Sequence, residues 1–303
     1  MNGKKKSTMN RRTFLKSSVA MVGAACGIPC SSGAQAQTDA KQAIPLKIGI
    51  RADSMKMAGN LDGIRTAAGI PGIMGVELQV TSGKPNLRDW DTVRRYKREA
   101  DRWAMRIPSL AGVFDSGGIS GPNAAENIRL SIRAAELLGS SALLLAFFKK
   151  QAPDMTRKDS YGPIVAMLRE VAPRASDAGV KLGLENSLSP ADNARLVDLV
   201  GHPAVGVYYD LHNMAFYGHG EHAIPGIKLL GKERICAVHV KNGDKLIEEP
   251  GPIDWAAAFR EFNAIGYEDW YVYETSHDNI EDCIKDTQRN NVFLRQHARM
   301  PAA

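Results

Sequence analysis

Four side chains that can bind a metal ion or move a proton stand at the ends of four consecutive apolar runs. They are Glu185, Asp210, His239 and Glu274, at steps of 25, 29 and 35 residues. One strand-plus-helix unit of a (β/α)8 barrel of about 250 residues averages roughly 31 residues. Because the carboxyl ends of barrel strands converge on one face, we expect the four side chains to meet at one point.

Three carboxylates and one imidazole form a donor set that suits a divalent cation. Hard oxygen donors favour Mn²⁺ first and then Mg²⁺, with Co²⁺ and Zn²⁺ as further alternatives. The set contains no thiolate, which argues against a structural zinc site. The sequence therefore predicts one divalent metal ion as the cofactor.

Such a site has a defined chemistry on a keto-sugar. A cation bound to a ketone oxygen and a neighbouring hydroxyl polarises the carbonyl and acidifies the adjacent C–H, so that a glutamate can remove the proton and leave a metal-bound enediolate. Return of a proton to the opposite face gives an epimerase, and return to the adjacent carbon gives an aldose–ketose isomerase. Loss of a β-substituent gives a lyase or dehydratase. All three outcomes stay open.

The elements that must position these residues alternate along the chain. Eight apolar runs are predicted as buried parallel strands: Leu46–Arg51, Gly75–Gln79, Ile107–Val113, Ala142–Phe147, Val180–Glu185, Val205–Asp210, Ile235–Val240 and Trp270–Glu274. Between them lie helical patterns: Trp90–Met105, Ala124–Leu138, Tyr161–Ala178, Ser189–Val200 and Asp254–Ile265. Asp89, Asn123 and Ser189 are predicted N-caps.

This alternation predicts an α/β fold, a single-domain (β/α)8 TIM barrel over residues 46–303. A doubly wound sheet is the alternative architecture. It is disfavoured because no G-x-G-x-x-G turn follows the first predicted strand.

Residues 1–36 have the features of a twin-arginine signal peptide that is removed. Asn10-Arg-Arg-Thr-Phe-Leu-Lys16 is the motif, Ser17–Ile28 is the apolar stretch and Ala34-Gln-Ala36 is the cleavage site. Because a membrane span needs about 20 apolar residues, the shorter apolar stretch disfavours stable membrane insertion. The sequence therefore predicts export to the periplasm, with a lipid anchor at Cys26 as the less favoured alternative.

Removal of the signal peptide changes the net charge, and it removes Cys26 and Cys30 so that Cys236 and Cys283 remain. Residues 1–36 hold six of the 39 basic residues and no acidic one, so the rest carries 33 basic and 33 acidic residues. This neutrality argues against a nucleic-acid partner. Residues 37–45 are predicted to be a linker, and Cys236 is predicted to be a buried apolar side chain rather than part of a disulfide framework.

Several motifs around the strand ends resemble those of the xylose isomerase-like TIM barrels, the sugar phosphate isomerase/epimerase superfamily. The motifs are Tyr208-Tyr-Asp210, His239-Val-Lys-Asn242, Gly251-Pro-Ile-Asp-Trp255 and Gly266-Tyr267 followed by Trp270-Tyr-Val-Tyr-Glu274. The resemblance implies that Glu185, Asp210, His239 and Glu274 bind one divalent metal. It also implies that Glu185 and Glu274 are catalytic and move protons on opposite faces of the substrate.

Two positions depart from the pattern of the ketose epimerases in that family. Those enzymes usually carry Asp-x-x-His. In this chain the third residue after Asp210 is Asn213, and the histidine is one position earlier, at His212. They often carry an arginine six residues after the metal histidine, where this chain has Lys245. Because lysine lacks the planar fork of arginine, the contacts with substrate are expected to differ.

The predicted substrate-binding residues are Glu77, His212, Asn213, Lys241 and Lys245. The predicted function is an exported, metal-dependent sugar isomerase/epimerase that acts on a keto-sugar, and a homo-oligomer is compatible with the sequence. A lyase or dehydratase acting on a 3-keto sugar or keto-glycoside is the first alternative. A non-catalytic sugar-binding barrel is the second, whereas an endonuclease IV-type nuclease would need more histidines at the strand ends.

Overall fold

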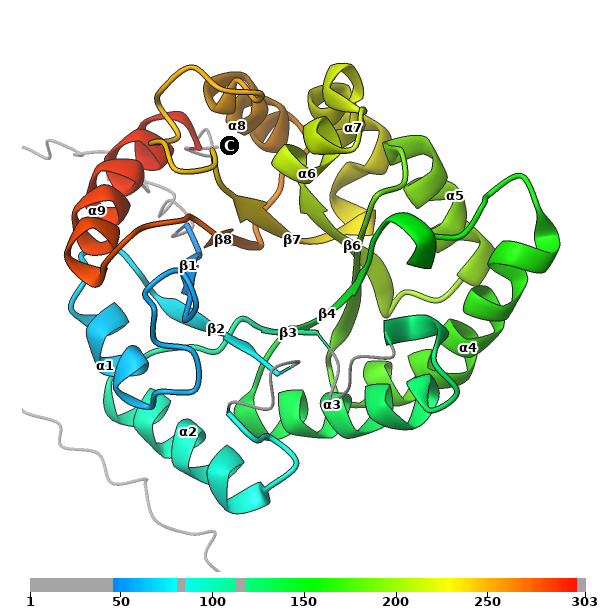
Figure 1. The fold of residues 1–303 in the computed structure, drawn as a ribbon, viewed down its shortest axis with the longest axis horizontal. Coiled ribbons are helices and arrows are strands. Elements are labelled where there is room, and N and C mark those ends of the chain that lie inside the picture. The colour runs from blue at the N-terminus through cyan, green and yellow to red at the C-terminus, as the bar shows by residue number, and fades with distance from the viewer. Residues whose placement is uncertain (1–45, 81–84, 113–117, 299–303) are drawn as a thin grey trace, which may run out of the picture. The chain divides into compact units, whose positions relative to one another are not determined.

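A closed barrel of eight parallel strands, paired in chain order, forms the centre of the fold (Figure 1). The structure is a computed structural model that describes residues 46–80, 85–112 and 118–298. The strands are β1 (Ile48–Arg51), β2 (Gly75–Gln79), β3 (Ser109–Ala111), β4 (Ala142–Phe147), β5 (Lys181–Asn186), β6 (Val205–Asp210), β7 (Ile235–Val240) and β8 (Trp270–Tyr273). The predicted (β/α)8 barrel is therefore confirmed.

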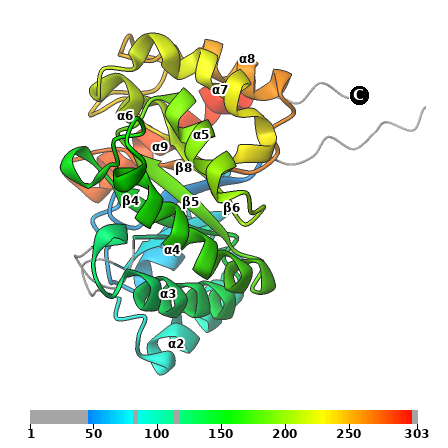
Figure 2. The same cartoon turned by 90° about the vertical axis from the view of Figure 1, so that its right-hand side faces the viewer.

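Helices surround the barrel on the outside, and α3, α4 and α5 cover the strands from β4 to β6 (Figures 1 and 2). The α-helices in the described ranges are α1 (Asp62–Ala68), α2 (Trp90–Arg102), α3 (Ala124–Leu138), α4 (Lys158–Asp177), α5 (Pro190–Val200), α6 (Leu211–Phe216), α7 (Gly220–Arg234), α8 (Trp255–Ala264) and α9 (Ile280–His297). Two 3-10 helices, η1 (Gly118–Ser120) and η2 (Lys149–Gln151), follow β3 and β4.

The predicted strands and helices are present, but some of their ends differ by up to three residues: α2 ends at Arg102 rather than Met105, and α4 begins at Lys158 rather than Tyr161. Strand β3 is shorter than the predicted Ile107–Val113, and Val113 lies outside the described residues. Asp89 and Ser189 accept hydrogen bonds from backbone amides of their helices, as predicted. Asn123 is at the N-cap position of α3, as predicted, but its side chain makes no capping hydrogen bond.

The strand sequences are apolar on both faces because helices cover one face and the barrel interior covers the other. Inside the barrel, Tyr208 and Trp270 belong to a small apolar cluster. Gly183 on β5 leaves space there, since a Cβ atom at this position would lie 2.9 Å from Cys236 Sγ and 3.1 Å from Tyr208 Cβ. Cys236 is buried with a free thiol, as predicted.

The predicted signal peptide and linker, residues 1–36 and 37–45, lie outside the described residues. None of the helices in the described part of the chain combines the length and apolar character that crossing a membrane requires.

Candidate active site and metal centre

The barrel register brings the four predicted metal ligands together. Asp210 on β6 lies directly opposite His239 on β7, while Glu185 belongs to β5 and Glu274 follows β8. One ligand atom from each of the four residues lies within 4.8 Å of the other three. The side chains expected to meet at the carboxyl ends of the strands therefore do so.

His239 stands at the centre of this cluster with a fully buried side chain. Its Nδ1 atom lies 3.2 Å from Glu274 Oε2, 3.4 Å from Glu185 Oε1 and 3.9 Å from Asp210 Oδ2. Its Nε2 atom faces the opposite way and lies 3.1 Å from Glu77 Oε1. The two ring nitrogens thus have separate tasks, one toward the ligand cluster and one toward Glu77.

Glu77 on β2 is the centre of a buried polar network below the cluster. Tyr208 Oη donates to Glu77 Oε2 at 2.6 Å, Ser109 Oγ donates to the same oxygen, and Arg51 Nε lies 3.1 Å from Glu77 Oε1. Burial alone would raise the pKa of Glu77, but His239, Arg51 and the Ser109 hydrogen bond outweigh it and lower the pKa. Glu77 is therefore an ionised carboxylate that can only accept hydrogen bonds. In its hydrogen bond with His239, the donor is the N–H group at Nε2.

Burial alone would lower the pKa of His239, but the carboxylates of Glu77 and Glu185 outweigh burial and raise that pKa. With its proton on Nε2 held by Glu77, the ring can offer the lone pair of Nδ1 to a cation. This is the carboxylate–histidine arrangement that orients metal-binding imidazoles in proteins.

Two cationic side chains balance the carboxylates of the cluster. Lys241 Nζ lies 2.7 Å from Asp210 Oδ2 and 2.6 Å from Glu274 Oε2. Arg51 forms an ion pair with the other oxygen of Glu274, Oε1, in addition to its contact with Glu77. Arg51 was not among the predicted site residues, although it ends β1 in the same way that the ligands end β5 to β8.

A cavity of about 320 Å³ opens above the cluster. Its lining residues are Arg51, Gln79, Ala111, Gly112, Leu144, Ala146, Phe148, Glu185, Asn213, Tyr217, Lys241 and Glu274. The rings of Phe148 and Tyr217 are stacked with centroids 5.4 Å apart and form an apolar part of this lining. The cavity therefore has an acidic and basic floor with an aromatic wall.

The predicted substrate-binding residues fall into two groups. Asn213 and Lys241 line the cavity, and Asn213 Nδ2 donates to Glu185 Oε1 at 2.8 Å. Glu77 lies beneath the cavity as a partner of His239. The half-buried His212 and the exposed Lys245 are not part of the lining, and Lys245 Nζ donates to Pro250 O at 3.4 Å. Substrate contacts by all five residues stay predictions.

The residues present fit a divalent cation. With metal–oxygen distances of about 2.0–2.2 Å, ligands on opposite sides of one ion lie roughly 4 Å apart, and the cluster of ligand atoms spans 4.8 Å. Asp210 Oδ2 is buried and receives no hydrogen bond from any described residue. Its contact with Lys241 Nζ is an ion pair without hydrogen-bond geometry. A buried carboxylate oxygen of this kind suits a metal ligand.

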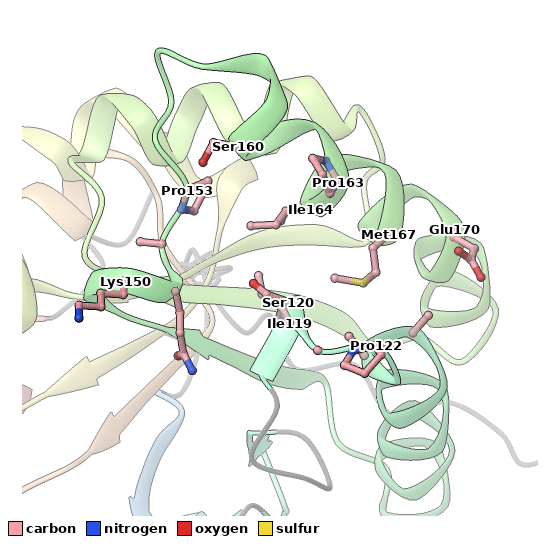
Figure 3. A pocket seen from close by; sticks show the side chains of 15 residues that line it. Ile119, Ser120, Pro122, Lys150, Pro153, Ser160, Pro163, Ile164, Met167 and Glu170 are labelled. Carbon is pink, nitrogen blue, oxygen red and sulfur yellow. The ribbon is translucent and has the colours of Figure 1, made fainter.

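A second hollow of about 450 Å³ lies outside the barrel, between the segment from η1 to α3 and the segment from η2 to α4 (Figure 3). Ile119, Pro122, Ile164 and Met167 contribute apolar side chains to its mixed lining. Its two charged residues, Lys150 and Glu170, are at opposite ends in the view of Figure 3. The only cluster of potential metal ligands found among the described residues is in the central site.

Fold and site together define a TIM-barrel protein with a carboxylate–histidine ligand cluster at the carboxyl ends of its strands. Residues 64–297 match the model of the family described as xylose isomerase-like TIM barrel, and the chain belongs to that family. No curated protein sequence matches the chain.

Solved structures with this fold include several sugar epimerases. D-psicose 3-epimerase from Clostridium cellulolyticum H10, solved with D-tagatose, has a TM-score of 0.69 at 18% identity, covering 84% of this chain and 100% of that one. An L-ribulose 3-epimerase has a TM-score of 0.60 at 22% identity, with 84% and 92% covered. The 3-keto-D-glucoside 4-epimerase from E. coli has a TM-score of 0.61 at 15% identity, with 83% and 99% covered.

Proposed function

We propose that this protein is a divalent-metal-dependent sugar isomerase/epimerase that acts on a keto-sugar. The observation that carries the proposal is the meeting of Glu185, Asp210, His239 and Glu274 within 4.8 Å, next to a cavity that Glu185 and Glu274 line. The names of the solved structures with the same fold, which include a psicose, a ribulose and a keto-glucoside epimerase, support this class of substrate.

We assign the four cluster residues as the ligands of one divalent cation, with Mn²⁺ as the preferred ion. When bound, the cation supplies Lewis-acid polarisation of a carbonyl and so acidifies the neighbouring C–H. Glu77 holds the Nε2–H of His239 and fixes the orientation of its ring. Asn213 holds one oxygen of Glu185 by its amide and thereby sets the direction of that carboxylate.

We assign proton transfer to Glu185 and Glu274, which both line the cavity. Glu185 takes the proton from the carbon next to the ketone, and Glu274, protonated beforehand from solvent, returns a proton from the other side; Glu185 then releases its proton to solvent. Arg51, paired with Glu274, keeps that carboxylate in place at the cavity wall. The aromatic wall of Phe148 and Tyr217 excludes water from one side of the substrate.

We further propose that the substrate is an unphosphorylated keto-sugar or keto-glycoside met outside the cytoplasm. The twin-arginine motif within residues 1–36 supports export to the periplasm. A cavity of about 320 Å³ is at the lower end of the usual range for small-molecule sites, roughly 300–1,000 Å³, which supports a small substrate.

The test is incubation of Mn²⁺-loaded protein with a panel of keto-sugars in D₂O, followed by NMR. The expected result is solvent deuterium at the carbon next to the ketone together with an epimer or an aldose. Elimination products would move the assignment to a lyase or dehydratase. Binding of sugar without any exchange of hydrogen in the whole panel would contradict an isomerase or epimerase.

A further inference from the structure

Lys241 makes contacts that a bound metal ion would need for itself. Its ammonium group lies 2.7 Å from Asp210 Oδ2 and 2.6 Å from Glu274 Oε2. The same two oxygens lie 3.9 Å and 3.2 Å from His239 Nδ1, so they are the carboxylate atoms that face the histidine ligand. The ammonium group of Lys241 therefore contacts the same carboxylate oxygens that face His239.

The surroundings leave Lys241 as the main counter-charge of Asp210. Asp210 Oδ1 accepts a hydrogen bond from the backbone N–H of Asn213, whereas Oδ2 has no hydrogen-bond donor among the described residues. Glu274, in contrast, has Arg51 on its other oxygen. The side chain of Lys241 is only 14% exposed, which limits screening of its charge by water.

An ammonium group and a metal ion at these two oxygens would compete. A metal–oxygen bond of about 2.0–2.2 Å would bring a divalent ion next to the position of the Lys241 nitrogen, where two positive charges repel strongly. Binding of the ion therefore requires the lysine side chain to leave Asp210 and Glu274. Because Lys241 also lines the cavity, its ammonium group has a place to move to.

We propose that Lys241 competes with the metal ion for Asp210 and Glu274, and so sets the metal affinity of the site. In protein stripped of metal it holds the carboxylates together, and in metal-loaded protein its ammonium group turns into the cavity toward the substrate oxygens. This inference rests on the metal site of the proposed function. It adds that the ammonium group of Lys241 occupies two metal ligands until a metal ion displaces it.

The test compares Mn²⁺ binding to the wild-type chain, Lys241→Met and Lys228→Met, all stripped with a chelator and titrated at one pH by electron paramagnetic resonance. Lys228 is an exposed lysine of α7 and provides the same loss of charge away from the site. Since Lys241→Met removes a competing positive charge within 3 Å of two ligands, we expect its Kd for Mn²⁺ to fall about tenfold or more. Lys228→Met is expected to match the wild type.

Thermal unfolding provides a second measurement on the same samples. Stripped Lys241→Met should melt below the stripped wild type, because Asp210 loses its counter-charge. Saturating Mn²⁺ should raise the melting temperature of the variant more than that of the wild type, because tighter binding stabilises the folded state more. Lys241→Gln, which keeps a polar side chain, should behave in the same way if the methionine variant does not fold.

The outcomes separate this inference from the proposed function. An unchanged or weaker Mn²⁺ affinity of the Lys241 variants, with normal binding by the wild type, would overturn the competition and leave the metal site standing. A wild-type chain that binds neither Mn²⁺ nor any other divalent ion would overturn both.

Discussion

Two hollows formed by described residues, one outside the barrel and one at its centre, differ in size and in the arrangement of charge. The outer one, between α3 and α4, is the larger at about 450 Å³, but Lys150 and Glu170 are at opposite ends in Figure 3. The central one has about 320 Å³, and charged side chains from the ends of β1, β5, β7 and β8 converge on it. Convergence of charge at the carboxyl ends of the strands, rather than volume, therefore distinguishes the candidate active site.

The largest effect is expected from Glu185→Gln in the central cavity. The amide cannot take a proton, so turnover should fall by about 10²–10⁴-fold, the usual contribution of a general base. The fold should be retained because glutamine preserves size and can still meet Asn213. Deuterium exchange by NMR measures the loss, and circular dichroism checks the fold. Turnover close to the wild-type rate would remove Glu185 from catalysis.

Asp210→Asn should have a similarly large effect on metal binding. Loss of a residue that hydrogen-bonds to a metal ligand typically weakens metal binding by roughly 10–100-fold. Replacement of Asp210, a direct ligand, should weaken Mn²⁺ binding by more than this. Isothermal titration with Mn²⁺ measures the change, with Asp192→Asn on α5 as a matched control at a distance from the cluster. Equal affinities of the two variants would contradict the assignment of Asp210 as a ligand.

Glu77→Gln should have a smaller effect because Glu77 acts through His239. Loss of the carboxylate that holds Nε2–H should weaken metal binding by about 10–100-fold. The absorption spectrum of Co²⁺-loaded protein should also shift, because the imidazole ligand is no longer held in one orientation. Glu77→Asp should recover part of the affinity. A variant with lower stability but the wild-type Co²⁺ spectrum would reduce Glu77 to a structural role.

The smallest effect is expected from Lys150→Met at the outer hollow. Substitutions on the surface usually change stability by no more than about 0.5 kcal/mol, and the residue has no contact with the ligand cluster. We therefore expect kcat/KM and Mn²⁺ affinity within about twofold of the wild type. A large loss of activity would show that the outer hollow belongs to the active site.

The barrel and the meeting of the four candidate ligands could be predicted because they depend on regular features of the sequence. Strands that end in an acid or a histidine at the spacing of one strand-plus-helix unit must meet at the barrel mouth. The same argument applied to the first strand would have found Arg51. The bonds of Ser109 and Tyr208 to Glu77 depend on register across the barrel, which a strand's own sequence does not specify.

The choice between His212 and Asn213 depended on local geometry. Asp210 caps α6 by accepting from the backbone N–H of Asn213, which brings the third residue after the aspartate back over the ligand cluster. His212, one position earlier, consequently does not line the cavity. The outer hollow could not be predicted at all, because it depends on how helices pack on the barrel.

The central claim is that one cation is held jointly by the residues at the ends of the last four strands. The most direct test is the number of Mn²⁺ ions bound per chain, measured by electron paramagnetic resonance on the wild type and on His239→Ala. We predict one tightly bound ion per wild-type chain and its loss in the variant. A wild-type chain without a bound ion, or a variant that binds Mn²⁺ as tightly as the wild type, would contradict this account.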